Sequence, residues 1–231
     1  MRIAVISDIH GNLEAMKTAY LDILEREADS IICLGDLTGY GPYPNEVIDF
    51  IREKRIMVVL GNYDASVVEK SFKYIKNNDI NKLCMPWAAS QLSSENVEYL
   101  KSLPQSLILK CNGIEIHFVH GSYRNINEYL NEDYDKLDEV MEEFNGDILV
   151  CGHTHIPYKK SFGDKLLIND GSIGKPKIGR PNGTYIILDT SKKGLRVEFI
   201  EFEYNHEKTI EAMKEKKLHT ACIENIMTGA E

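Results

Sequence analysis

Eight short runs rich in isoleucine, valine and aromatic residues recur along the chain, and their recurrence limits the fold more than any other feature. They cover residues 2–7, 30–35, 56–61, 114–120, 147–152, 166–169, 184–189 and 196–202. The earlier runs are continuous rather than alternating, as expected for strands buried on both faces. Apolar residues at helical spacing fill gaps at 13–24, 44–51 and 130–144. Alternating strands and helices predict a layered α/β fold.

The chain contains no internal repeat and no linker, so its 231 residues are predicted to form a single domain. Residues 65–105 are less regular; we expect a small helical segment there that either caps a site or serves packing. No apolar run approaches the ~20 residues that span a bilayer. The N-terminal MRIAVISDIH has no cleavage signal. These features predict a cytoplasmic protein without a membrane segment.

Net charge argues against polyanionic partners. The chain carries a formal charge of −9, which repels long nucleic acid at a distance. The five cysteines form no CxxC pair and their number is odd, so a disulfide framework is not expected.

Five polar clusters each stand at the C-terminal end of a predicted strand, which is where α/β sheets build their sites. Their sequences are DIH from residue 8, GD from 35, GNYD from 61, HG from 120 and GHTH from 152. Four of the seven histidines fall in these clusters. Carboxylate, imidazole and amide oxygen suit a hard or borderline divalent metal. None of the five clusters contains a cysteine, which argues against a thiolate zinc site. The clusters therefore predict a metal site.

Taken together and in this order, the motifs DIHGN, GD, GNYD, HG and GHTH resemble those of the calcineurin-type metallophosphoesterases. The similarity is greatest to bacterial single-domain members of phosphodiesterase type. Two further stretches, GDLTGYGPYPNEVI and NDGSIGKPKIGRPNGTYIILD, are also similar, so the resemblance extends to about residue 204. It implies two stacked mixed β-sheets flanked by helices, and residues 206–231 resemble the helical tail of longer members.

The resemblance implies two divalent metal ions and a ligand set. Asp8, His10 and His155 would hold the first ion, Asn62, His120 and His153 the second, and Asp36 would bridge both. Two dications, two carboxylates and one bridging hydroxide leave a charge of about +1, which favours a phosphate anion. Manganese, iron, zinc and nickel all suit these ligands, and the sequence does not choose among them.

Two-metal chemistry then predicts the reaction. A water shared by ions about 3.5–4 Å apart has its pKa lowered towards ~7 and attacks phosphorus in line with the leaving alcohol. The leading hypothesis is a phosphodiesterase that acts on small phosphodiesters. A phosphomonoesterase or protein phosphatase is the rival enzyme. A non-enzymatic scaffold, like the retromer subunit of similar fold with a degraded metal site, is the rival from another class.

The side chains next to the ligands allow alternatives. Tyr63 stands where many family members have a histidine, which is implied to assist the leaving group; Tyr63 either takes that role or packs under a cap. Asp64 either orients a metal-binding histidine or caps a helix. Asp170 replaces a usual proline and is expected to change loop stiffness.

Substrate contacts are predicted for Asn12, Tyr40 and Arg180. For each of these three residues, packing at a turn or at the surface is the alternative.

Overall fold

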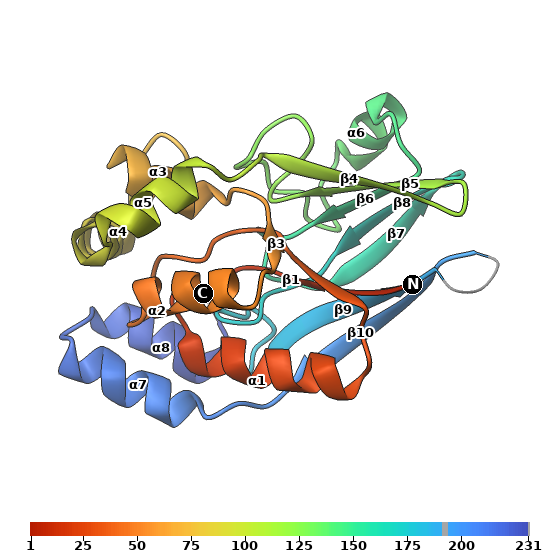
Figure 1. Ribbon diagram of the computed structural model, residues 1–231. Coiled ribbons are helices and arrows are strands. Elements are labelled where there is room, and N and C mark those ends of the chain that lie inside the picture. Colours follow the sequence, from red (N-terminus) through yellow and green to blue (C-terminus); the bar gives the residue numbers. More distant parts are fainter. Residues whose placement is uncertain (191–193, 231) are drawn as a thin grey trace.

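A computed structural model describes residues 1–190 and 194–230, and two five-stranded β-sheets face one another in it (Figure 1). The first sheet has the order β10-β9-β1-β2-β3, in which β1, β2 and β3 run parallel, β9 pairs antiparallel with β1, and β10 pairs antiparallel with β9. Its strands are β1 (Arg2–Ile6), β2 (Ser30–Cys33), β3 (Met57–Val58), β9 (Gly183–Asp189) and β10 (Arg196–Phe202).

The second sheet has the order β4-β5-β6-β8-β7. Strands β5, β6 and β8 run parallel, and β4 and β7 pair antiparallel at the two edges. Its strands are β4 (Ser106–Cys111), β5 (Ile114–Val119), β6 (Ile148–Cys151), β7 (Tyr158–Phe162) and β8 (Lys165–Asn169). The two mixed sheets confirm the predicted fold class.

Helices flank the pair of sheets (Figure 1). Five of them are α1 (Leu13–Glu25), α2 (Pro44–Glu53), α6 (Leu137–Glu143), α7 (His206–Glu215) and α8 (Thr220–Thr228). The segment 65–105 belongs to a separate helical group made of α3 (Asn62–Glu69), α4 (Asp79–Gln91) and α5 (Ser94–Lys101). None of the helices among the described residues has the length and apolar character that crossing a membrane requires.

Strand β1 illustrates why the runs are continuous. Successive side chains of a strand point to opposite faces. Ala4 and Ile6 pack in the core that joins the first sheet to α1 and α2, whereas Ile3 and Val5 pack in the core between the sheets. All four side chains are buried. Both faces of β1 are therefore covered, as the sequence pattern predicts.

Two strands were not predicted, and one predicted helix is wrong in extent. Strands β4 and β7 lie at sheet edges and alternate between exposed and partly buried residues, so they lack a continuous apolar run. The helix expected over 130–144 begins only at Leu137, because residues 130–136 form turns. Asparagine and aspartate in NEDYD favour such turns, and Leu130 is buried in the same core without being helical.

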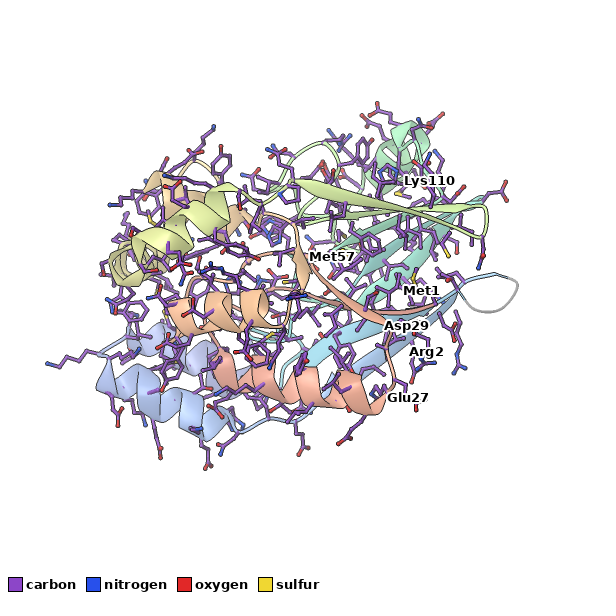
Figure 2. All side chains as sticks on the ribbon, viewed as in Figure 1. Met1, Arg2, Glu27, Asp29, Met57 and Lys110 are labelled. Carbon is purple, nitrogen blue, oxygen red and sulfur yellow. The ribbon has the colours of Figure 1, made fainter. Side chains whose placement is uncertain are left out.

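The parallel strands bring the polar loops to one end of the sheets. At the opposite end, the starts of β1 and β2 are joined by a 2.7 Å hydrogen bond from Arg2 N–H to Asp29 Oδ2 (Figure 2). At the C-terminal ends, Asp8 N–H donates to Gly35 O over 3.1 Å and His10 N–H to Asp36 O over 2.8 Å. The backbone thus ties the first polar loop to the second.

Candidate metal centre

The predicted ligands of the first ion lie together. Asp8 and His10 follow β1, and His155 follows β6. Asp8 Oδ1 is 3.2 Å from His155 Nε2 and 3.7 Å from His10 Nε2. One ligand atom from each of the three residues falls within 4.8 Å of the others, and all three residues are buried. This is the spacing of side chains able to share one ion.

The other predicted ligands lie against this group. Asp36 Oδ2 is 3.6 Å from His10 Nε2 and 3.5 Å from His120 Nε2, so it stands between the two histidines. His120 Nε2 is 2.6 Å from Asn62 Oδ1 and 3.2 Å from His153 Nδ1. Asp8, Asp36 and His120 also form a group of ligand atoms within 4.8 Å. The structure therefore brings all seven predicted ligands into one buried cluster.

The backbone at this cluster is held in a costly conformation. Five of the predicted ligands have left-handed φ values, namely Asp8 (51°), His10 (48°), Asp36 (53°), His153 (66°) and His155 (63°). For residues other than glycine this conformation costs roughly 1–2 kcal/mol each. Such strain persists where the surrounding structure imposes it, and it concentrates at functional sites.

A glycine permits the close approach of the third motif. A Cβ atom on Gly61 would lie 2.1 Å from both the backbone nitrogen and Oδ1 of Asp36. Any side chain at residue 61 would therefore push the loop that carries Asn62 away from Asp36.

Backbone carbonyls fix the orientation of three of the rings. His10, His120 and His155 place Nδ1 at 2.9, 2.7 and 2.5 Å from the carbonyl oxygens of Thr38, Leu34 and Lys175. A carbonyl oxygen only accepts, so each Nδ1 carries a hydrogen, and it is Nε2 that faces the cluster as the atom able to bind a metal. Partners of this kind orient metal-binding histidines.

The electrostatics of the cluster fit a bound cation. Burial lowers the pKa of His10 and of His153 well below the usual range, so both rings are neutral. Burial, Asp64 and Asp8 raise the pKa of Asp36 well above its usual range. His10 Nε2 and His155 Nε2 face each other at 3.4 Å. Clustered carboxylates and facing lone pairs are unfavourable alone, and a divalent ion stabilises both.

A pocket of about 330 Å³ opens onto the cluster. Part of the segment 65–105 forms one wall through Tyr74, Lys76 and Asn81. The segment therefore borders the site, while its tryptophan, Trp87, packs on two apolar clusters.

Tyr63 and Asp64 occupy different surroundings. The Tyr63 ring lines the pocket with its centroid 5.6 Å from that of His10, and its buried hydroxyl has no hydrogen-bond partner among residues 1–190 and 194–230. The Asp64 carboxylate accepts hydrogen bonds from Leu37 N–H and from the N–H and hydroxyl of Thr38. The hydrogen bonds of Asp64 thus go to the loop that carries Asp36 and not to a histidine ring. The residue that caps α3 is Gly61.

The structure places the three residues predicted to contact substrate in different environments. Tyr40 lines the pocket, and its hydroxyl donates to Asn81 Oδ1 over 2.8 Å. Asn12 does not: it is fully buried, and its Oδ1 accepts from Ala15 N–H as the cap of α1. Arg180 also lies outside the pocket lining, where it is paired with Glu201. The structure thus places Asn12 at a helix cap and Arg180 in a surface ion pair, and a substrate contact for either residue stays a prediction.

Several residues of the pocket were missed from the sequence. Tyr129 packs against His153 with ring centroids 3.9 Å apart, and Lys76, Lys175 and Lys177 line the same space. The two later lysines belong to the GKPK stretch that carries part of the family resemblance, which was an available signal. Tyr129 and Lys76 come from irregular segments between motifs, and no pattern marks them.

Comparisons with known proteins agree with this site. Residues 1–193 match the calcineurin-like phosphoesterase superfamily domain. An uncharacterised protein of Methanocaldococcus jannaschii is 35% identical over 98% of each chain. The phosphodiesterase YfcE of Escherichia coli is 24% identical over 82% of this chain and 88% of its own.

Among solved structures, a metallophosphoesterase from Sphaerobacter thermophilus superimposes with a TM-score of 0.82 and 28% identity, over 100% of this chain and 99% of its own. Fold, motifs and the buried cluster agree with this match. The chain belongs to the calcineurin-like phosphoesterase superfamily.

Proposed function

We propose that this chain is a two-metal phosphodiesterase that hydrolyses small phosphodiesters. The observation that carries the proposal is the convergence of seven ligand side chains, five of them on left-handed backbone, in one buried cluster that borders a pocket. A protein that used the fold only as a scaffold would gain nothing from strain at these positions.

The ligand assignment follows the two groups described above. Asp8, His10 and His155 would hold one ion, and Asn62, His120 and His153 the other. Asp36, between His10 and His120, would contact both. Bound divalent ions lower the pKa of water and neutralise charge on a phosphoryl group. Manganese, iron, zinc and nickel all fit the donor set.

The chain's own side chains favour a diester over a monoester. Burial raises the pKa of the Tyr63 phenol well above its usual range, so it stays protonated and donates a hydrogen bond without releasing its proton readily. An imidazolium, the better acid near neutral pH, is missing at this position. The curated relative YfcE is itself a phosphodiesterase, which supports the same preference.

The substrate is expected to be small and the enzyme cytoplasmic. A pocket of about 330 Å³ accommodates a compact ester. The net charge of −9 disfavours long duplex DNA, which binds through phosphate contacts along its length.

A comparison of two nitrophenyl esters tests the proposal. Protein loaded with each metal in turn is assayed on bis(p-nitrophenyl) phosphate and on p-nitrophenyl phosphate. We expect a higher kcat/KM on the diester. A preference for the monoester at neutral pH would support the monoesterase or protein phosphatase, and tight metal binding without turnover of either ester would support the scaffold.

A further inference from the structure

We propose that Cys84 and Cys222 form a reversible disulfide bond that fastens α4, which forms part of the pocket wall, to α8 of the C-terminal tail. This modification site is separate from the metal centre, and the inference holds whether or not the chain hydrolyses phosphodiesters. All five cysteines are free thiols in the structure, so the proposal concerns what an oxidant does to two of them.

The two cysteines meet between helices that are distant in the chain. Cys84 lies in α4 and Cys222 in α8, and these helices lie on the same side of the molecule (Figure 1). Both side chains are buried in one apolar cluster, together with Met213, Leu218 and Ile226. Within this cluster the two thiols hydrogen-bond to each other. An S–S bond is about 2 Å long, so two thiols already in hydrogen-bond contact need only a small shift of the helices to form one.

The hydrogen bond between the thiols makes one of them the more reactive. It lowers the pKa of the Cys222 thiol, and together with burial it raises the pKa of the Cys84 thiol. Cys84 is therefore the donor, and Cys222 is the sulfur that more readily becomes a thiolate. The thiolate is the form of cysteine that reacts with oxidants. By contrast, burial raises the pKa of Cys33 and of Cys151, which keeps these two thiols protonated and inert.

A second pocket, of about 260 Å³, gives a small molecule access to the pair. Its lining includes Cys84, Trp87 and Leu218. The exposed side chain of His219 is also part of this lining, so the pocket is open to solvent. A water molecule occupies about 30 Å³ in the liquid, and hydrogen peroxide is little larger. The pocket therefore admits a peroxide to the buried thiols.

Oxidation by a peroxide forms the bond in two balanced steps. The Cys222 thiolate attacks one oxygen of hydrogen peroxide, the O–O bond breaks, and the sulfur becomes a sulfenic acid while the released hydroxide takes a proton to give water. The Cys84 sulfur then attacks the sulfenic sulfur, the S–S bond forms, and the S–O bond breaks to release a second water. Two thiols are thus oxidised and one peroxide is reduced. A reducing thiol reverses the reaction by attack on the disulfide.

The bond links two parts of the pocket wall. Asn81 of α4 accepts a hydrogen bond from the Tyr40 hydroxyl, and both residues line the pocket at the metal centre. At the end of α8, Gly229 O accepts from Gly179 N–H over 2.8 Å, and Gly179 follows the GKPK stretch that lines the same pocket. In the reduced chain apolar packing holds α4 on α8, and in the oxidised chain a covalent bond is added. Disulfides of cytoplasmic proteins are usually transient and redox-sensing, which agrees with a single reversible bond.

Peptide mapping after oxidation tests the proposed bond. The full-length protein is loaded with zinc, which does not change its oxidation state, and is treated with hydrogen peroxide. We expect a cross-linked peptide that joins Cys84 to Cys222 and is lighter by two hydrogens than the two separate peptides, and dithiothreitol should restore both thiols. Cys111→Ser is the control, because Cys111 is partly exposed and lies in β4; this variant should form the same bond.

Thermal unfolding and amide hydrogen exchange test whether the bond fastens α4 to α8. The Tm of the oxidised wild-type protein should exceed that of the reduced protein by at least ~5 °C. Exchange over residues 79–91 and 220–228 should slow by at least ~10-fold. Cys84→Ser and Cys222→Ala, treated with peroxide in the same way, should show neither change.

The outcomes that overturn the inference are distinct. Peroxide treatment that leaves Cys84 and Cys222 as free thiols overturns it, and so does oxidation of either to a sulfinic acid without a bond, or a bond from either to another cysteine. A Cys84–Cys222 bond that leaves the Tm and the exchange of both helices unchanged overturns the claim that it fastens them. None of these measurements depends on turnover, so a failure of the proposed phosphodiesterase activity would be seen separately.

Discussion

The carboxyl of Asp170 lies 2.8 Å from the Ser7 hydroxyl, and the same hydroxyl lies 2.6 Å from Oδ2 of Asp8. A hydroxyl has one hydrogen to donate, so it cannot serve two ionised carboxylates. Burial and the charge of Asp8 raise the pKa of Asp170 well above its usual range. A protonated Asp170 donates to Ser7, which in turn donates to Asp8.

This series of hydrogen bonds from Asp170 through Ser7 to Asp8 predicts a pH-dependent effect of Asp170→Asn on stability. The folded-state pKa of Asp170 is raised, so between its unfolded pKa and its folded pKa the folded protein binds more protons. Its contribution to the unfolding free energy is therefore greatest below the unfolded pKa and is lost as pH rises. The variant has no such loss, because its amide donates at every pH. The stability of the variant relative to wild type should grow with pH, by at most ~1.4 kcal/mol per pH unit.

Urea denaturation in the presence of a chelator, from pH 4 upwards, checks this difference. Asp164→Asn is the control, because Asp164 is exposed at the turn between β7 and β8; the difference it makes should not change with pH. A constant difference for Asp170→Asn would show that Asp170 does not carry the extra proton.

Tyr63 is expected to act on the leaving group. A p-nitrophenolate departs without help, so Tyr63→Phe should change kcat/KM on bis(p-nitrophenyl) phosphate by less than about threefold. A basic alkyl leaving group needs a donor, so the same variant should lose more on an alkyl diester, and Tyr63→His should gain there, within the ~10²–10⁴-fold that general acid catalysis supplies. Paired kinetics on the two esters check this. Equal effects on both leaving groups would mean that the ring, which is 2% exposed, serves packing alone.

Asn12 is expected to matter for stability and not for catalysis. It caps α1 and also donates to Gly174 O and to the Tyr204 hydroxyl, each over 2.9 Å. Loss of an N-cap side chain costs ~1 kcal/mol, and the buried partners left unpaired add to this. Asn12→Ala should therefore lower the unfolding free energy by about 2–3 kcal/mol.

Thermal or urea unfolding measures this loss, and Asn12→Ser, which keeps a capping oxygen, should recover part of it. The kcat/KM of the folded Asn12→Ala protein should stay within about threefold of wild type. A drop of ten-fold or more in that variant alone would return Asn12 to the substrate site.

The location of motifs at strand ends was predictable, because a residue that directly follows a strand must lie at the end of that strand. Asp8 follows a buried strand directly, and the parallel neighbour β2 brings Asp36 to the same edge of the first sheet, while His120 follows β5 of the second sheet. The pocket wall was less accessible to sequence reasoning. Tyr129 and Lys76 reach the site through turns whose path depends on tertiary packing, and hydrophobic spacing even suggested a helix next to Tyr129 where none forms.

Polar side chains outside the motifs were the hardest to interpret. Asn12, Asp64 and Arg180 each had a functional and a packing interpretation from sequence, and the choice depends on partners distant in the chain. Asn12 bonds to Tyr204 among others, Asp64 to Thr38 and its neighbour Leu37, and Arg180 to Glu201. Local spacing contains no information on such pairs.

Metal stoichiometry tests the central claim most directly. Wild-type protein and Asp36→Asn are stripped with a chelator, reloaded with manganese or zinc, freed of excess metal and analysed for metal per chain. We predict two ions per wild-type chain and clearly fewer in Asp36→Asn, because Asp36 stands between His10 and His120. The kcat/KM on bis(p-nitrophenyl) phosphate should fall by about 10²–10³-fold in the variant. A wild-type chain that takes up a single ion, or an Asp36→Asn protein with full metal content and full activity, would contradict the two-metal account.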